Sequence, residues 1–234
     1  MNYLYLLGPL SLSPWQNNEI RYSLRSVGAL DRRARIFIAG PEVPDFLSAI
    51  THIPVEIKPV FGKYKNMQRQ LKEACEAAHV PEDLLLMNDD FLIRKTPVWD
   101  WSPTYTGMIP KHDPRKPGNR WRRSLVATGV WLQGQGIEEP RCYEGHTPMP
   151  FEKTKALPIL RRLIVHEKDL QFRSAYGNLV DVGGKLHPNA KRSDPEKWPE
   201  DSPFWSLKSN VNEKAKTFLA TWLAKPSPWE NQNG

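Results

Sequence analysis

The sequence predicts an α/β protein whose mostly parallel sheet is flanked by helices and followed by a loop-rich C-terminal half. Short apolar runs alternate with segments of helical period over roughly the first 90 residues, which is typical of a parallel sheet. The apolar run Leu84–Met87 leads directly into Asn88, Asp89 and Asp90. Most of the 22 prolines follow residue 96, and this favours extended structure over helix in the second half.

The first half contains clear start and stop signals for these elements. Ser13 is a candidate N-cap, with Pro14 at the first helical position. Ile20, Leu24 and Val27 then recur at helical spacing. The expected elements are a strand at 3–7, a helix at 14–27, strands at 35–40 and 52–55, a helix at 63–78 and a strand at 84–87.

The second half shows weaker periodicity. We expect an aromatic-rich loop with short strand pieces over 97–110, a helix over 152–165 and a terminal helix over 212–223. The polar, proline-rich segment that begins at residue 181 separates one domain, 1–180, from an extension, 181–234, that packs on the same domain.

Length and composition indicate which classes of protein fit this sequence. The 234 residues suit one large domain or one domain with an extension. Lys and Arg number 33 against 26 Asp and Glu, and this net charge of +7 favours polyanionic partners such as nucleic acid or nucleotide phosphates. No run reaches the roughly 18 to 20 apolar residues of a membrane span, and Met1–Leu12 lacks the features of a signal peptide. Cys75 and Cys142 are the only cysteines, which predicts a reduced cytoplasmic protein without structural zinc.

The acid pair Asp89 and Asp90 interrupts a buried apolar run. Buried charge is normally paired or bound to a metal. Two carboxylates at the end of a strand suit Mg²⁺ or Mn²⁺ that carries nucleotide phosphates. The alternative is a plain turn, since Asn-Asp-Asp is also good turn chemistry.

Basic residues are also expected near the edge of the predicted sheet where the acid pair lies. Arg21 and Arg25 lie four apart on one helix, where they can bind a diphosphate or form a solvated basic face. Lys63 and Lys65 fall at the start of the next helix, where cations oppose the helix dipole unless a ligand anion is present. Ligands of parallel sheets bind outside the carboxyl ends of the strands, so the sequence predicts a nucleotide site there.

The stretch from Lys111 to Arg123 is the most basic in the chain, with six Lys or Arg against one acid. It combines cations with an aromatic ring, as phosphate-tracking segments that stack on bases do. A solvated loop is the alternative. The candidate residues are Lys111, Arg115, Lys116, Arg120, Trp121, Arg122 and Arg123.

His146 stands between Gly145 and a proline-rich turn, which fixes the backbone as a ligand position requires. A hydrogen-bonded structural histidine is the alternative.

Three stretches together carry a resemblance to a known family: Trp15–Ser26, Met87–Phe91 and His146–Phe151. In this order they resemble the Stealth-like nucleotide-sugar transferases, which have a glycosyltransferase-A-like catalytic domain, and especially short bacteriophage members. The resemblance covers roughly residues 1–180 and identifies that range as a nucleotide-sugar transferase domain.

The resemblance implies a nucleotide-sugar donor, UDP-linked, and Mn²⁺ or Mg²⁺ held through Asp89 and Asp90. Asp90 is the better candidate for direct ligation, and His146 is expected beside the metal or the leaving diphosphate. Arg21 and Arg25 are carried over as donor-phosphate groups. With Asn18, Lys65 and Asp89 they make up the predicted donor-binding residues.

An acceptor hydroxyl attacks the anomeric carbon in such a reaction, and an inverting enzyme needs a group that takes its proton. Asp45, Glu144 and His146 are the candidates, without ranking. The chain is shorter than typical Stealth proteins and shows no membrane segment. These features favour a compact cytoplasmic enzyme, in the host cytoplasm if the protein is phage-encoded, with an acceptor other than a capsule polymer.

The leading hypothesis is a metal-dependent glycosyltransferase that modifies a hydroxymethylated base in phage DNA. Such an enzyme must take the base out of the stack or catch it unpaired, and Trp99, Trp101 and Trp121 are candidates to fill the gap. One alternative is transfer of sugar or sugar phosphate to a surface glycan or lipid-linked acceptor. Another is a non-catalytic nucleic-acid-binding protein. That alternative does not explain the acid pair Asp89 and Asp90.

Overall fold

The computed structural model describes residues 1–94, 100–110, 118–199, 201–208 and 211–231. Its centre is a five-stranded sheet in which β1 pairs in parallel with both β2 and β4, β2 pairs in parallel with β3, and β7 runs antiparallel to β4. The mostly parallel sheet expected from the sequence is therefore confirmed. In sheet order the strands are β3 (Thr51–Pro54), β2 (Arg35–Gly40), β1 (Asn2–Leu6), β4 (Asp83–Met87) and β7 (Met149–Glu152).

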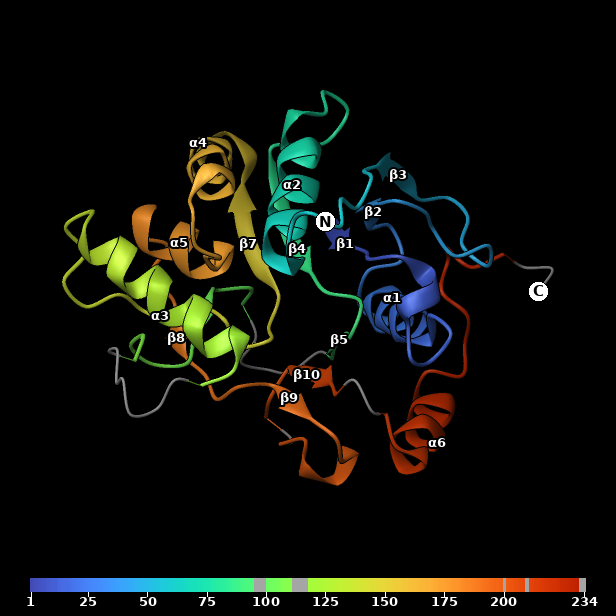
Figure 1. The fold of residues 1–234 in the computed structure, drawn as a ribbon. Helices are drawn as coiled ribbons and strands as arrows, with labels where there is room; N and C mark the ends of the chain where they lie inside the picture. Colours follow the sequence, from blue (N-terminus) through green and yellow to red (C-terminus); the bar gives the residue numbers. More distant parts are fainter. Residues whose placement is uncertain (95–99, 111–117, 200, 209–210, 232–234) are drawn as a thin grey trace.

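Helices cover both faces of this sheet (Figure 1). Because side chains of a strand alternate between faces, Leu4 packs in one core cluster while Tyr3 and Tyr5 pack in another. The Leu4 cluster includes residues of α2 (Lys63–Glu76), α4 (Lys153–Val165) and α5 (Phe172–Leu179), and the Tyr3 cluster includes residues of α1 (Asn18–Leu30).

The chain after β4 adds a second, smaller layer below the central sheet (Figure 1). β10 (Phe204–Leu207) lies between β5 (Phe91–Ile93), to which it is antiparallel, and β9 (Lys191–Arg192). A third core cluster joins this sheet to α6 (Glu213–Trp222) through Trp198 and Trp205. The remaining elements are η1 (Leu10–Leu12), β6 (Thr104–Tyr105), α3 (Arg120–Gln133), β8 (Lys185–Leu186) and η2 (Pro195–Lys197).

The first helix begins later than the sequence predicts, at Asn18 rather than at Pro14. Ser13 does not cap the helix. Its hydroxyl accepts a hydrogen bond from the backbone N–H of Asn17 at 2.7 Å and donates to Glu19 Oε2 at 2.8 Å. Asn17 has a left-handed backbone with φ of 62°, so the segment from Pro14 forms turns before the helix starts.

The expectation that the proline-rich second half avoids helix is wrong for α3 and α5. Neither helix contains a proline, whereas α4 accommodates Pro158. Residues Arg120–Arg123, expected in a basic loop, form the first turn of α3, with the side chain of Asn119 accepting from the N–H of Arg122 as a cap. In the described part of the chain, no helix has both the length and the apolar character needed to cross a membrane.

Candidate functional site

A cavity of about 480 Å³ opens at the carboxyl ends of β1 and β4. Apolar residues of η1 and of the loop that precedes α2 line it. Polar groups line it as well, with Lys63 at the first position of α2 and Asn88 and Asp89 directly after β4. The lining residues used below are Leu12, Ile57, Pro59, Phe61, Lys63, Asn88 and Asp89. The cavity therefore combines apolar and charged lining groups.

Asp89 carries a poorly compensated negative charge in this cavity. Burial, together with the neighbouring charges of Asp90 and Glu19, raises the pKa of its carboxyl to about 7, against a lowering effect from Lys63. A cation beside this carboxylate would relieve that repulsion. Among the described residues no three His, Cys, Asp or Glu side chains form a metal cluster.

Asp90 faces a different environment although it is the next residue. Its Oδ2 accepts hydrogen bonds from Lys191 Nζ at 3.0 Å and from Ser206 Oγ at 2.9 Å. Its backbone oxygen accepts from the N–H of Leu207 at 2.9 Å. Asp90 thus ties the end of β4 to the small sheet, and its expected role as a direct metal ligand stays a prediction.

His146 is held in one orientation by Asn189. The backbone N–H of Lys191 donates to Asn189 Oδ1 at 2.9 Å, which identifies that atom as the amide oxygen. The imidazole Nδ1 lies 3.1 Å from the same oxygen, so Nδ1 carries the proton and Nε2 keeps its lone pair. Burial, together with the charge of Lys191, lowers the pKa of His146 to about 4, so the ring is neutral at neutral pH. A fixed neutral imidazole suits a ligand role, although His146 does not line the large cavity.

Arg173 joins the two segments that carry these groups. Its guanidinium donates to Thr147 O at 2.8 Å, to Asn88 Oδ1 at 3.1 Å and to Leu86 O at 3.4 Å. Burial lowers the pKa of Arg173 to about 10, which still leaves the side chain charged at neutral pH. Nothing in the sequence pointed to this residue, because a single arginine in an apolar helix pattern gives no signal of its own.

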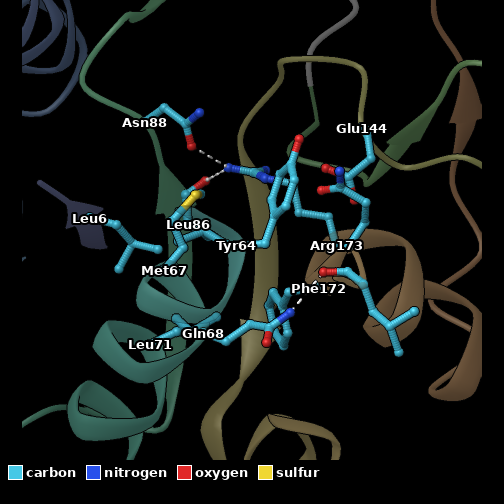
Figure 2. Close-up of a pocket in the computed structure, with 12 residues that line it drawn as sticks. Leu6, Tyr64, Met67, Gln68, Leu71, Leu86, Asn88, Glu144, Phe172 and Arg173 are labelled. Atoms are coloured by element: carbon cyan, nitrogen blue, oxygen red, sulfur yellow. Dashed lines mark hydrogen bonds between the residues drawn. The ribbon is translucent and has the colours of Figure 1, made fainter. Parts of the chain in front are cut away.

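Glu144 lines a smaller cavity next to the first, together with Asn88 and Arg173 (Figure 2). Its Oε1 accepts from the backbone N–H of Ser174 at 3.0 Å and from the hydroxyl of Ser174 at 3.1 Å. Burial raises the pKa of this carboxyl, while Arg173 opposes the shift. Of the three candidates for a proton acceptor, Glu144 is therefore the one that shares a cavity with a residue of the strand-end site.

Arg21 and Arg25 are engaged by an acid that lies 205 positions beyond Arg25 in the sequence. Arg25 Nε and a terminal nitrogen contact Glu230 Oε1 and Oε2 at 2.9 and 2.7 Å. Arg21 contacts the same carboxylate at 3.1 Å and stacks on the Phe46 ring. Both side chains therefore anchor the C-terminal segment in this structure, and their expected role with the donor phosphates stays a prediction.

Of the other predicted donor and catalytic residues, some lie near the large cavity and some lie away from it. Asn18 donates to Trp15 O at 3.0 Å and so stabilises the turn before α1. Lys63 lines the large cavity and Lys65 does not. Asp45 is exposed, and its backbone oxygen holds the side chain of Asn231 at 2.6 Å.

The predicted acceptor residues are only partly described. Lys111, Arg115, Lys116 and Trp99 lie outside the described residues. Arg120 bonds to Asp169 at 2.8 Å and its guanidinium lies 5.7 Å from the centre of the Tyr64 ring, at the start of α2. Trp121 is 38% exposed. The basic first turn of α3 therefore adjoins the helix that borders the large cavity.

A mostly parallel sheet flanked by helices, with a cavity at the carboxyl ends of its strands, defines an α/β class of protein in which ligands commonly bind at that edge. The glycosyltransferase-A fold within this class is shown by comparison with solved structures. The galactosyltransferase LgtC, in complex with donor and acceptor sugar analogues, aligns over 96% of this chain and 97% of its own, with a TM-score of 0.51 and 10% identity. The mostly parallel sheet flanked by helices is thus that of glycosyltransferase-A-type enzymes.

Other similarities are weaker. A 4-diphosphocytidyl-2C-methyl-D-erythritol synthase from Anaerococcus prevotii aligns over 96% of this chain and 98% of its own, with a TM-score of 0.44 and 10% identity. No family model matches the sequence. No curated protein matches it either. The resemblance to Stealth-like transferases and to bacteriophage members stays a prediction.

Proposed function

We propose that the protein transfers a sugar from a nucleotide-sugar donor to an acceptor hydroxyl, and that the donor nucleotide binds in the cavity of about 480 Å³. The observation that carries this proposal is that apolar residues of η1 and of the loop before α2 line the same cavity as Lys63 of α2 and Asp89 after β4. The fold shared with LgtC supports the same class of reaction, because that neighbour is a galactosyltransferase.

The two kinds of lining group suit the two ends of a nucleoside diphosphate. Leu12, Ile57 and Phe61 offer apolar contact for the base. Lys63 and the N-terminus of α2 favour the diphosphate, since the first N–H groups of a helix carry partial positive charge. Asp89 on its own would repel the phosphates. A divalent cation, Mn²⁺ or Mg²⁺, held by Asp89 would offset that repulsion and stabilise the charge that develops on the leaving diphosphate.

The residues around the cavity then position the reacting groups. Arg173 keeps Asn88 and the loop before β7 in place through its three hydrogen bonds. Burial raises the pKa of the Glu144 carboxyl, which makes it a stronger base and a candidate to take the proton of an acceptor hydroxyl. His146, with a free Nε2, is the other candidate.

Titration calorimetry with UDP in the presence and absence of Mn²⁺ tests the donor site directly. We expect UDP to bind wild-type protein with Mn²⁺ and more weakly after chelation. A panel of labelled nucleotide sugars with hydroxymethylated DNA or glycan acceptors then identifies the reaction. Absence of nucleotide binding under all conditions would refute the proposed function.

We further propose DNA that carries a hydroxymethylated base as the acceptor, and the position of α3 supports this choice. Its basic first turn adjoins the start of α2, with Arg120 over Tyr64 and the exposed Trp121 beside it. A glycan acceptor, or sugar-phosphate transfer, is the alternative that the same acceptor panel distinguishes. DNA binding without any transfer would instead indicate a nucleic-acid-binding protein.

A further inference from the structure

One face of α2 lines the large cavity, through Lys63, Asn66, Met67 and Gln70. Lys63 is the first residue of the helix, and Gln70 lies seven residues further on, which corresponds to about 10 Å along the helix axis. Lys63 is expected at the diphosphate. The distance from Lys63 to Gln70 is comparable with the span from the phosphates to the base of a nucleotide, so Gln70 is a candidate contact for the base.

Two backbone carbonyl groups at neighbouring strands fix the amide of Gln70. Its Nε2 donates to Leu7 O, directly after β1, and to Ala39 O of β2 at 3.2 Å. Because a carbonyl oxygen can only accept, these contacts identify the nitrogen and use both of its N–H groups. Rotation of the amide would place Oε1 against two oxygens. Gln70 therefore offers a ligand an acceptor and no donor.

The acceptor of Gln70 is unpartnered without being sealed inside the protein. Gln70 is 2% exposed and lines the large cavity, and its Oε1 has no hydrogen-bond partner among the described residues. Among those residues, the unpartnered side-chain atoms that are completely buried include the Oε1 of Gln68 and not that of Gln70. An acceptor held at the wall of a cavity favours a ligand that donates to it.

The apolar lining residues restrict what kind of donor suits this position. Ile57 and Phe61 line the same cavity and offer contact to the flat faces of a base. For a pyrimidine ring held between such groups, uracil carries an N3–H on its hydrogen-bonding edge, whereas cytosine has a lone pair at the same ring atom. Oε1 can accept from the first and is repelled by the second, because the fixed amide cannot turn its nitrogen toward the ring.

We propose that Gln70 reads the base of the donor: its Oε1 accepts a hydrogen bond from the N3–H of uracil, and this selects uridine over cytidine nucleotides. The inference rests on the proposed function, because it requires the nucleotide to occupy the large cavity. Gln70 is then a specificity-determining residue that touches the base and not the sugar or the phosphates.

The first test changes only the ligand. Calorimetry on the wild-type full chain with Mn²⁺ compares UDP with CDP, with N3-methyl-UDP, which lacks the N–H, and with 2′-deoxy-UDP, which lacks a ribose hydroxyl. We expect CDP and N3-methyl-UDP to bind about 10-fold more weakly than UDP, or weaker still, because Oε1 loses its donor. We expect 2′-deoxy-UDP to bind within about 3-fold of UDP.

The second test changes the protein. Gln70→Met keeps the side-chain length and removes the amide, and we expect it to bind UDP and CDP within about 2-fold of each other. Gln68→Met is the matched control (Figure 2). Gln68 lies on the same helix, is also 2% exposed and also donates to a backbone oxygen, that of Leu170, but it does not line the large cavity. We expect this control to keep the wild-type preference for UDP.

The outcomes separate the two proposals. Equal wild-type affinity for UDP and N3-methyl-UDP would overturn the role of Gln70, and so would a preference for CDP or a loss confined to 2′-deoxy-UDP. If Gln70→Met weakens UDP and CDP equally, Gln70 has a structural role only. The measurements on wild type stand even if Gln70→Met does not fold. Failure of wild type to bind any nucleotide would instead overturn the proposed function.

Discussion

Asp89 and Asp90 are adjacent in sequence, yet they differ in what their charges face. Asp89 lines the large cavity, while Asp90 is compensated by Lys191 and bonded to Ser206. Removing either charge should therefore have different consequences. The loss of Asp89 affects a ligand, and the loss of Asp90 affects the attachment of the small sheet.

Asp89→Asn should keep the fold and reduce Mn²⁺-dependent UDP affinity by about 10-fold or more, because the carboxylate proposed to hold the cation is gone. Asp90→Asn should lower the free energy of unfolding by about 1–3 kcal/mol, because Lys191 loses a partly buried partner. Calorimetry and chemical denaturation of both variants check this pair of expectations. The reverse pattern would assign the metal to Asp90.

Arg173→Lys should weaken the site without abolishing folding, because lysine keeps the charge but cannot donate in the same planar geometry. We expect a loss of roughly 2–4 kcal/mol in unfolding free energy and a clear drop in nucleotide affinity. Denaturation and UDP titration of this variant provide the measurement. Full nucleotide affinity would show that Asn88 and the loop before β7 hold their positions without Arg173.

Among the secondary-structure elements, α3 places its cations next to the start of α2. Arg120 is committed to Asp169 and to contact with Tyr64, whereas Arg122 and Arg123 lie one and two positions beyond Trp121. Arg123 donates to Gly118 O at 2.9 Å. We expect Arg122 and Arg123, rather than Arg120, to meet phosphates, because Arg120 is held by an acid.

Arg122→Ala combined with Arg123→Ala should weaken DNA binding for all sequences and flatten its salt dependence by about one to two units, at roughly 0.7–0.9 for each phosphate that is no longer neutralised. The measurement is DNA affinity at several salt concentrations. UDP affinity should not change in this double variant, since neither residue lines the large cavity. Identical salt dependence in wild type and variant would favour a glycan acceptor.

Across the molecule as a whole, the C-terminal segment closes the structure against α1. Glu230 bonds to Arg25 and Arg21, and its neighbour Trp229 is buried in the core cluster that contains Tyr3 and Tyr5 of β1. The backbone of Trp229 also accepts from the N–H of Ser48 at 2.7 Å. Residues near the two ends of the described chain thus pack in the same core cluster.

Glu230→Gln should lower the free energy of unfolding by about 2–4 kcal/mol, because two partly buried guanidinium groups lose their common acid. Arg25→Ala should destabilise the protein to a similar extent. Nucleotide affinity of the folded Arg25→Ala variant decides its role. Unchanged affinity confirms a structural arginine, while a loss of about 10-fold restores the donor-binding role expected from the sequence.

Local sequence patterns were sufficient to predict the order and type of most elements in the first half and the position of the acid pair at the end of β4. These features depend on periodicity and on turn residues, which are written within a few positions of one another. The helices α3 and α5 were not predicted in the same way, because overall proline content does not show which segments are free of proline.

Long-range packing, in contrast, sets which acid faces the cavity, which acid neutralises Arg21 and Arg25, and which carbonyl groups fix the amide of Gln70. In each case the deciding contact joins residues far apart in sequence, such as Asp90 with Lys191 at a separation of 101 positions. Local patterns do not encode such pairings, because they are set by how the helices and the small sheet pack around the central sheet.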